Sequence, residues 1–233
     1  MSEVRRSRAE ARVHQIETIK STSRRLMAKR GAPALSLREV AREMGLVSSA
    51  IYRYFPTRDD LLTALIVDAY NDLGASAERA IARCADGDAR RRLHAVAGSI
   101  RRWAKRNPHE YALIYGSPIP GYDAPELTIA AATRVTLVLA TVVTDAWRGS
   151  DERARAAVDA PLPDGMLERR GFETVMPGVP DVTRARAIIV WSQIFGFVSF
   201  ELFGHYRGSV RNTNRYFDFV VDEMADLVLP TSG

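Results

Sequence analysis

The segment from Ser36 to Asp60 carries the densest set of local folding signals in the chain. Ser36 stands three residues before Glu39, which is the spacing of a capping box at a helix N-terminus. Apolar residues recur at helical spacing over the next two turns, and Gly45 then occupies the expected left-handed C-cap. Ser48 is the expected cap of a second short helix. A helix, a tight turn containing glycine and a second helix form the helix-turn-helix unit, whose second helix enters the DNA major groove.

The second helix of this unit has an apolar side and a polar side. Ile51 and Phe55 are four residues apart, so both are expected to face the core. Small residues let a backbone approach base edges, Arg reads guanine or holds a phosphate, and hydroxyls donate to phosphates. We therefore predict that Ser49, Ala50 and Arg53 face bases, and that Ser36, Arg38, Ser48, Tyr52, Tyr54 and Arg58 hold phosphates. The alternative is a helical hairpin whose polar face is only solvated.

Three runs of this segment carry a family resemblance: SLREVA from Ser36, GLVS from Gly45 and IYRYFPTRDDLL from Ile51. They resemble the DNA-binding domain of TetR-type transcriptional regulators, and the likeness covers about residues 12–72. Ser36, Thr57 and Arg58 stand where the family usually has Thr, Ser and Lys. Both hydroxyls cap equally well, and Arg58 keeps the positive charge that the family directs at a phosphate. The resemblance implies a regulator of transcription, and repression is implied by the resemblance alone.

The distribution of charge supports a nucleic-acid partner. The chain has a net charge of +5, and residues 1–60 hold 13 basic against 7 acidic side chains. The remaining residues are close to neutral. A positive field confined to one domain is the electrostatic footprint of DNA binding.

The rest of the chain predicts an all-α fold, because no segment alternates at period two. We expect a flexible basic arm over 1–11, a helix-turn-helix domain over 12–60, a connecting helix over 58–84 and a helical ligand-binding and dimerisation domain over 85–230. Gly74 is expected to weaken or kink the connecting helix. The segment 149–180 predicts a mobile loop with one helical stretch near 152–158. Further helices are expected at 9–30, 89–106, 109–115, 126–147, 181–203 with Asp181 as its cap, and 212–229.

The last two helices carry more aromatic surface than one helix pair buries within its own domain. A helix with apolar residues all round lies inside a bundle or contacts another chain. Two-fold symmetric dimers are the commonest oligomers, so we predict a homodimer with Phe195, Phe203, Phe217 and Phe219 at the interface. The run Trp191 to His205 resembles the C-terminal domain of a TetR subgroup marked by Trp, His and Gly, although Phe195 replaces the expected His.

Aromatic and aliphatic residues of the central helices offer a lining for a small molecule. Few charges accompany them, so the ligand is expected to be largely apolar. The candidate ligand-binding residues are Trp103, Tyr111, Tyr115, Val135, Leu139 and Trp191, for each of which core packing is the alternative role. Ligand binding would favour a dimer with the wrong spacing of recognition helices and so release a near-palindromic operator.

Catalysis and metal binding have no support in the sequence. No two of the four His residues have metal-ligand spacing, and no G-x-S-x-G motif is present, so no enzyme activity, cofactor or metal is expected. The single Cys84 excludes a disulfide framework and suits the cytoplasm, and the basic N-terminus leads into no signal-peptide core. The run 187–203 is too short and polar to span a bilayer, so no membrane partner is expected. Two alternatives stay open: a DNA-binding protein without ligand response, and a helical bundle or enzyme whose hairpin is incidental.

Overall fold

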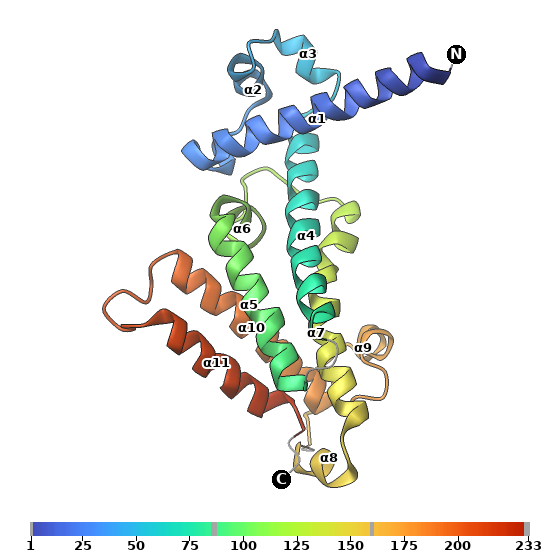
Figure 1. Cartoon of the computed structure of the whole chain (residues 1–233), viewed down its shortest axis with the longest axis vertical. Helices are drawn as coiled ribbons and strands as arrows, with labels where there is room; N and C mark the ends of the chain where they lie inside the picture. The colour runs from blue at the N-terminus through green and yellow to red at the C-terminus, as the bar shows by residue number, and fades with distance from the viewer. Residues whose placement is uncertain (1, 85–87, 159–160, 231–233) are drawn as a thin grey trace. The chain divides into compact units, whose positions relative to one another are not determined.

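The computed structural model describes residues 2–84, 88–158 and 161–230. Within these ranges every regular element is helical, and no strand is present, which confirms the all-α prediction. The α-helices are α1 (Ser2–Arg30), α2 (Leu37–Glu43), α3 (Ser48–Tyr52), α4 (Arg58–Ala82), α5 (Ala89–Arg106), α6 (Pro108–Tyr115), α7 (Ile129–Gly149), α8 (Glu152–Val158), α9 (Arg169–Val175), α10 (Asp181–Leu202) and α11 (Thr213–Val228). Two 3-10 turns, η1 (Ala32–Ala34) and η2 (Glu126–Thr128), complete the set (Figure 1).

The chain divides into two compact units. Unit 1 comprises residues 1–69 and 107–129, and unit 2 comprises residues 70–106 and 130–233. This division differs from the predicted domains in two respects: α6 and the Pro/Gly-rich segment after it belong to unit 1, and the connecting helix is divided between the two units. The early part of α4 lies in unit 1 and its later part in unit 2.

The helix-turn-helix of unit 1 begins and ends largely as its capping signals predict. The Ser36 hydroxyl accepts a hydrogen bond from the Glu39 backbone N–H at 3.2 Å. The Glu39 carboxylate does not return the bond but pairs with Arg30 at the end of α1. Gly45 has φ of 67°, and Leu46 N–H donates to the Ala41 carbonyl at 2.9 Å across the turn. A left-handed residue at this point ends α2 and allows the chain to turn into α3.

Two capping predictions need correction. Ser48 does not cap α3: Val47 is the N-cap residue and no side chain accepts from the helix. Asp181 lies inside the first turn of α10, where it pairs with Arg184 at 3.0 Å, and Pro180 takes the cap position.

The cap of α4 is stronger than expected. Thr57 Oγ1 accepts from Asp60 N–H at 3.0 Å and Asp60 Oδ2 accepts from Thr57 N–H at 2.9 Å, a reciprocal capping box.

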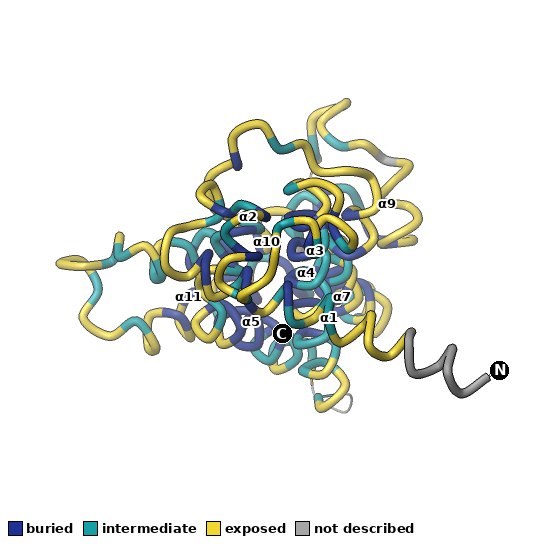
Figure 2. Tube along the Cα trace, turned by 90° about the horizontal axis from the view of Figure 1, so that it is seen from above, coloured by how far each residue is buried: buried dark blue, intermediate teal, exposed yellow. Residues whose placement is uncertain are grey.

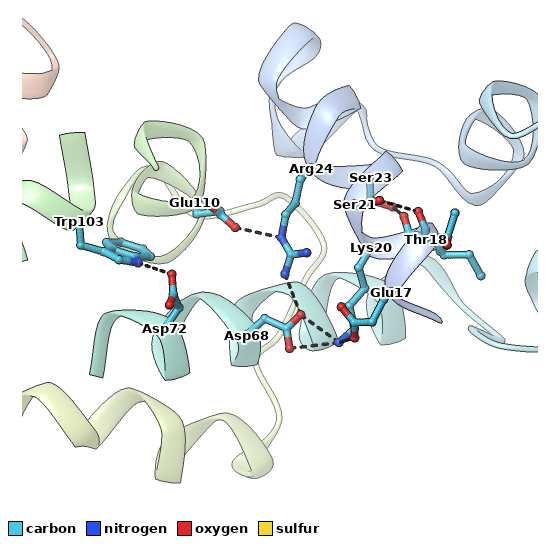
Figure 3. A network of polar contacts seen from close by, with 11 residues as sticks. Glu17, Thr18, Lys20, Ser21, Ser23, Arg24, Asp68, Asp72, Trp103 and Glu110 are labelled. Atoms are coloured by element: carbon cyan, nitrogen blue, oxygen red, sulfur yellow. Dashed lines mark hydrogen bonds and ion pairs between the residues drawn. The ribbon is translucent and has the colours of Figure 1, made fainter. Parts of the chain in front are cut away.

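The first helix starts earlier than the sequence predicts. The segment expected as a loose arm forms the first turns of α1, which begins at Ser2. An ion-pair cluster fixes α1 within unit 1 (Figure 3). Asp68 of α4 accepts from Lys20 and Arg24 of α1 at 2.9 and 2.7 Å, and Arg24 also reaches Glu110 of α6 at 2.9 Å. The Asp68 carboxylate therefore joins α1 to α4, and Arg24 connects α1 to α6 as well.

Unit 2 is built around α5, α10 and α11, with α10 and α11 side by side (Figure 1). A polar cluster ties all three together. Arg101 of α5 donates to both carboxylate oxygens of Glu201 on α10, each at 2.6 Å, and to Asn214 of α11 at 2.7 Å. Lys105 adds a contact to Glu201 at 3.1 Å. Burial alone would raise the pKa of Glu201, but the hydrogen bonds and charges of Arg101 and Lys105 outweigh it and lower that pKa to about 2.

Gly74 has a packing role and not the expected role of a kink. It is buried within the uninterrupted helix α4. A Cβ atom added to Gly74 would lie 2.7 Å from the Cβ atom of Arg134 on α7, which is closer than two non-bonded carbon atoms can approach. Arg134 reaches past this point to Glu78 at 2.6 Å and to the Asn71 carbonyl at 3.0 Å. The glycine thus allows α4 and α7 to pack closely.

Two helical stretches, Glu126–Gly149 and Asp181–Leu202, are long and apolar enough to cross a membrane by length and composition alone. In the first stretch, half of the residues in its most apolar segment are buried, as in the core helix of a globular protein. In α10 only 28% of the residues in the most apolar segment are buried, so this helix leaves apolar surface uncovered. Along α11 buried and exposed positions also mix (Figure 2).

Candidate nucleic-acid interface and effector cavity

Helix α3 turns its apolar residues inward and leaves a polar face in solvent. Ile51 of α3 and Phe55 are 0% and 7% exposed, as predicted, but the helix ends at Tyr52, so Phe55 follows it and is not on it as expected. Ser49 and Arg53 are exposed, Tyr52 is 43% exposed, and Ala50 is half-buried. None of these four side chains has a polar contact with the described part of the chain. The face is therefore available for groups outside the protomer, such as base edges and phosphates.

The predicted phosphate-holding residues fall into two groups. Arg38 is exposed, and Ser36 and Ser48 are half-buried, at or near the first turns of α2 and α3. Arg58 is engaged within the protein: its Nε donates to the Leu35 carbonyl at 2.9 Å and its Nη2 to the Pro33 carbonyl at 3.1 Å. This guanidinium holds the α1–α2 connection against the start of α4. In the absence of DNA, the contacts of Arg58 therefore stabilise the fold of unit 1.

Two residues at this face were not predicted. The guanidinium of Arg12 on α1 lies 5.3 Å from the centre of the Tyr54 ring, a cation–π contact that places a positive charge beside α3. Val47 is 71% exposed just before α3 and presents methyl groups that could contact thymine. The sequence signal for Arg12 was present, but the residue sat next to the segment expected as a loose arm.

Unit 2 contains an apolar cavity of about 200 Å³ between α5, α7, α9 and α10. Thr136 and Trp191 are the lining residues with a polar side-chain atom, and no charged side chain contributes. The lining residues include Leu93, Leu139, Ala140, Val143, Phe172, Met176, Ile188 and Trp191. Such a lining favours an uncharged, mostly apolar molecule.

The structure places two of the six predicted ligand residues, Leu139 and Trp191, in this lining. Trp103 is buried and donates to Asp72 at 2.7 Å (Figure 3), and Val135 is a core residue of α7. Tyr111 and Tyr115 belong to unit 1, where their ring centres lie 5.2 Å apart. The contribution of α9 was missed, because residues 149–180 were expected to be mobile.

The predicted interface aromatics also divide into two groups. Phe203, directly after α10, and Phe219 of α11 are 49% and 56% exposed, so another chain can contact them. The structure corrects the prediction at Phe195 and Phe217, which are 7% and 4% exposed. Phe217 packs edge-on against Phe197, with ring centres 5.0 Å apart, and lies under the Arg101 guanidinium at 4.7 Å. Both residues therefore belong to the core of unit 2.

No group of three or more His, Cys, Asp or Glu residues suited to a metal ion occurs in the described ranges. Cys84 is a free, half-buried thiol.

Comparison with known families supports the reading of both parts of the chain. Residues 19–65 match the family described as bacterial regulatory proteins, tetR family. Residues 93–224 match the family described as Tetracyclin repressor-like, C-terminal domain. The Trp-His-Gly subgroup is not distinguished by these matches.

Individual relatives agree with the family matches. The chain is 40% identical over 195 residues to an HTH-type transcriptional regulator of Mycobacterium tuberculosis, and to one of Mycobacterium bovis, with 82% of each chain covered. The crystal structure of the regulatory protein SCO4313 is similar at a TM-score of 0.74 and 30% identity, covering 94% of this chain and 98% of that one. The TetR family regulator PfmR of Thermus thermophilus has the same fold at a TM-score of 0.57 and 18% identity, covering 88% and 96%. These relatives are regulators of transcription and not enzymes. The chain therefore belongs to the TetR family of DNA-binding transcriptional regulators.

Proposed function

We propose that the protein is a ligand-responsive repressor that binds a near-palindromic operator as a homodimer and is released by a largely apolar small molecule. The observation that carries the DNA-binding part is the solvent-exposed face of α3. Ser49 and Tyr52 of α3, and Arg53 directly after it, are exposed there, and the buried Ile51 anchors the helix. Because such regulators act on chromosomal DNA, we place the protein in the cytoplasm.

A homodimer is supported by the apolar surface that α10 and α11 leave uncovered. Phe200, Phe203 and Phe219 are each about half exposed. Exposed aromatic residues on adjacent helices are typical of a surface that another chain covers. Two copies related by a two-fold axis would place their recognition helices about 34–36 Å apart, one turn of DNA, so the operator should be a near-palindrome.

Release by a small molecule is supported by the apolar cavity of unit 2. A cavity of about 150 Å³ lined by Leu, Ile and Phe is known to hold benzene, so a space of similar size suits a compact apolar ligand. A ligand that binds one dimer conformation more tightly shifts the population toward it. If that conformation has the wrong spacing of recognition helices, operator affinity falls. The helix α4 runs through both units and is the element we expect to carry this coupling.

The DNA-binding part is tested by fluorescence anisotropy with the upstream intergenic DNA and a scrambled duplex across a salt series. We expect a preference of about 10³-fold or more for the cognate DNA at physiological salt and a steep salt slope. Tyr52→Ala should weaken binding to all sequences alike, whereas Arg53→Ala should relax the preference at one base pair. Arg91→Ala, which removes an exposed arginine of unit 2, is the charge-matched control. Binding to neither duplex would refute the proposal, and equal binding to both would leave only a non-specific DNA binder.

The effector part is tested by titrating small apolar compounds while operator release is followed. Ala140 is 6% exposed and lines the cavity, so Ala140→Phe should fill the space and abolish the response while operator binding persists. Thr141→Phe alters the adjacent exposed residue and should leave the response intact. Ligand binding in the cavity without any loss of DNA affinity would contradict this part and favour a regulator without ligand response.

A further inference from the structure

A second hollow of unit 2, between α4 and α5, has a chemistry opposite to that of the effector cavity. Its volume is about 400 Å³, and its lining includes four arginines: Arg79, Arg83, Arg102 and Arg106. The other lining residues are small or hydroxyl-bearing, with one thiol, and none carries a carboxylate. No residue lines both this basic groove and the effector cavity.

The four arginines of the groove differ from the five paired arginines of the same unit, although other exposed arginines such as Arg91 are also unpaired among the described residues. Arg90, Arg92, Arg101, Arg134 and Arg184 each contact a carboxylate at ion-pair distance. None of the four groove arginines forms such a pair with any residue in 2–84, 88–158 or 161–230. All four are exposed, so solvent screens part of the repulsion between them, but their gathering around one hollow creates a positive potential that attracts anions. A bound anion would relieve this repulsion.

Gly98, which lines a neighbouring hollow and not the groove itself, leaves room for one of the groove arginines. Glycine destabilises the interior of a helix relative to alanine, yet Gly98 lies in the middle of α5. An added Cβ would meet the Arg102 guanidinium, with Nη1 at 2.9 Å. The glycine therefore allows the Arg102 side chain to lie flat along its own helix, beside the groove.

We propose that this basic groove binds a small anion bearing phosphate groups. Guanidinium groups match phosphate oxygens with paired, charge-assisted hydrogen bonds, and four of them can neutralise two or more phosphate charges. The volume lies within the range of small-molecule sites. A concave site of this size fits a diphosphate-sized ligand better than the broad surface of an acidic protein, which needs a much larger contact area.

The test is isothermal titration calorimetry of the full-length protein with pyrophosphate, at constant ionic strength and without DNA. We expect saturable binding of pyrophosphate, with sulfate binding much more weakly. A nucleoside diphosphate in a parallel titration distinguishes the sources: tighter binding assigns the site to an organic phosphate, and equal binding assigns it to the phosphate groups alone.

Variants then locate the site. Arg79→Gln and Arg102→Gln should each weaken pyrophosphate binding about tenfold, the loss expected for one charge-assisted contact. Gly98→Ala should weaken it as well, because the new methyl group displaces Arg102. Arg91→Gln removes an exposed arginine of the same helix that does not line the groove, and it should have no effect.

The thermal unfolding midpoint of each variant serves as the control for correct folding. In the absence of anion, the arginine variants should be as stable as the wild type or slightly more stable, since they reduce repulsion. Absence of saturable pyrophosphate binding would overturn the proposal. So would an equal loss in Arg91→Gln, or a groove that binds DNA or an acidic peptide in place of pyrophosphate.

Discussion

Replacement of Glu201 by glutamine tests how the polar cluster of unit 2 contributes to stability. The carboxylate is 10% exposed and accepts from two nitrogens of Arg101 and from Lys105. Glu201→Gln keeps the size of the side chain but removes its charge. Arg101, itself 11% exposed, would then face a neutral amide in a partly buried site. Removing one partner of a buried ion pair costs about 3–5 kcal/mol.

The pKa of Glu201 gives a second measure of the same effect. Its folded value of about 2 lies below the ordinary 4.5, which corresponds to about 3 kcal/mol in favour of the folded state at neutral pH. Because the folded pKa is lowered, this stabilisation is complete above pH 4.5 and is lost as the pH falls toward 2. At pH 3 it should have declined to about 1.5 kcal/mol.

The assay is urea denaturation of the wild type and Glu201→Gln at several pH values from 7 to 3. The difference in free energy of unfolding should be about 3 kcal/mol at pH 7 and should narrow by about half at pH 3. Glu223→Gln, on the exposed side of α11, is the matched control and should differ little from the wild type at any pH. A difference at pH 7 below about 1 kcal/mol, or one that does not change with pH, would refute the reasoning.

Three further substitutions probe helix packing and capping through urea or thermal denaturation. Gly74→Ala should destabilise by about 1–3 kcal/mol despite its better helix propensity, because the new methyl group clashes with Arg134; unchanged or increased stability would contradict the close packing of α4 on α7. Thr57→Ala should cost about 0.5–2 kcal/mol by removing the cap shared with Asp60, while Thr57→Ser should retain most of the stability; equal losses in the two variants would argue against a capping role. Asp68→Asn should destabilise by about 1 kcal/mol, because the two α1 cations lose a shared carboxylate; salt should reduce the effect, and indifference to salt would count against the ion pairs.

Most helices were predictable because their signals are local. The range of α5, 89–106, follows from apolar spacing ended by Asn107-Pro108, and the structure agrees with it. The cap at Ser36 and the turn at Gly45 were also correct, since each depends on a few neighbouring residues. Helix α9 could not be found this way. Its seven residues carry few periodic apolar positions, and its place depends on packing of Phe172 and Met176 in unit 2.

Of the two candidate sites, only the DNA-binding face could be predicted, because its residues are identified by their exposure on a short helix. The outward face of α3 could be deduced from the inward pair Ile51 and Phe55. The ligand residues could not, because the sequence does not say which of several buried side chains border a void. Trp103 and Leu139 looked equivalent in the sequence, yet only Leu139 lines the cavity. The role of Gly74 was equally hidden, since its partner Arg134 lies 60 residues away.

The assignment of residues 107–129 to unit 1 has a consequence for how the protein is made. During synthesis the ribosome releases α1 to α3 first, but Glu110, the α6 partner of Arg24, emerges only after the whole of α5. Unit 1 therefore cannot complete its contacts until about half of the polypeptide has been translated. A fragment ending near residue 69 would carry the recognition helix without the α6 support of α1. We expect such a fragment to be less stable than the same helices within the full chain, and maturation of the DNA-reading surface to be delayed until the nascent chain has passed Ile129.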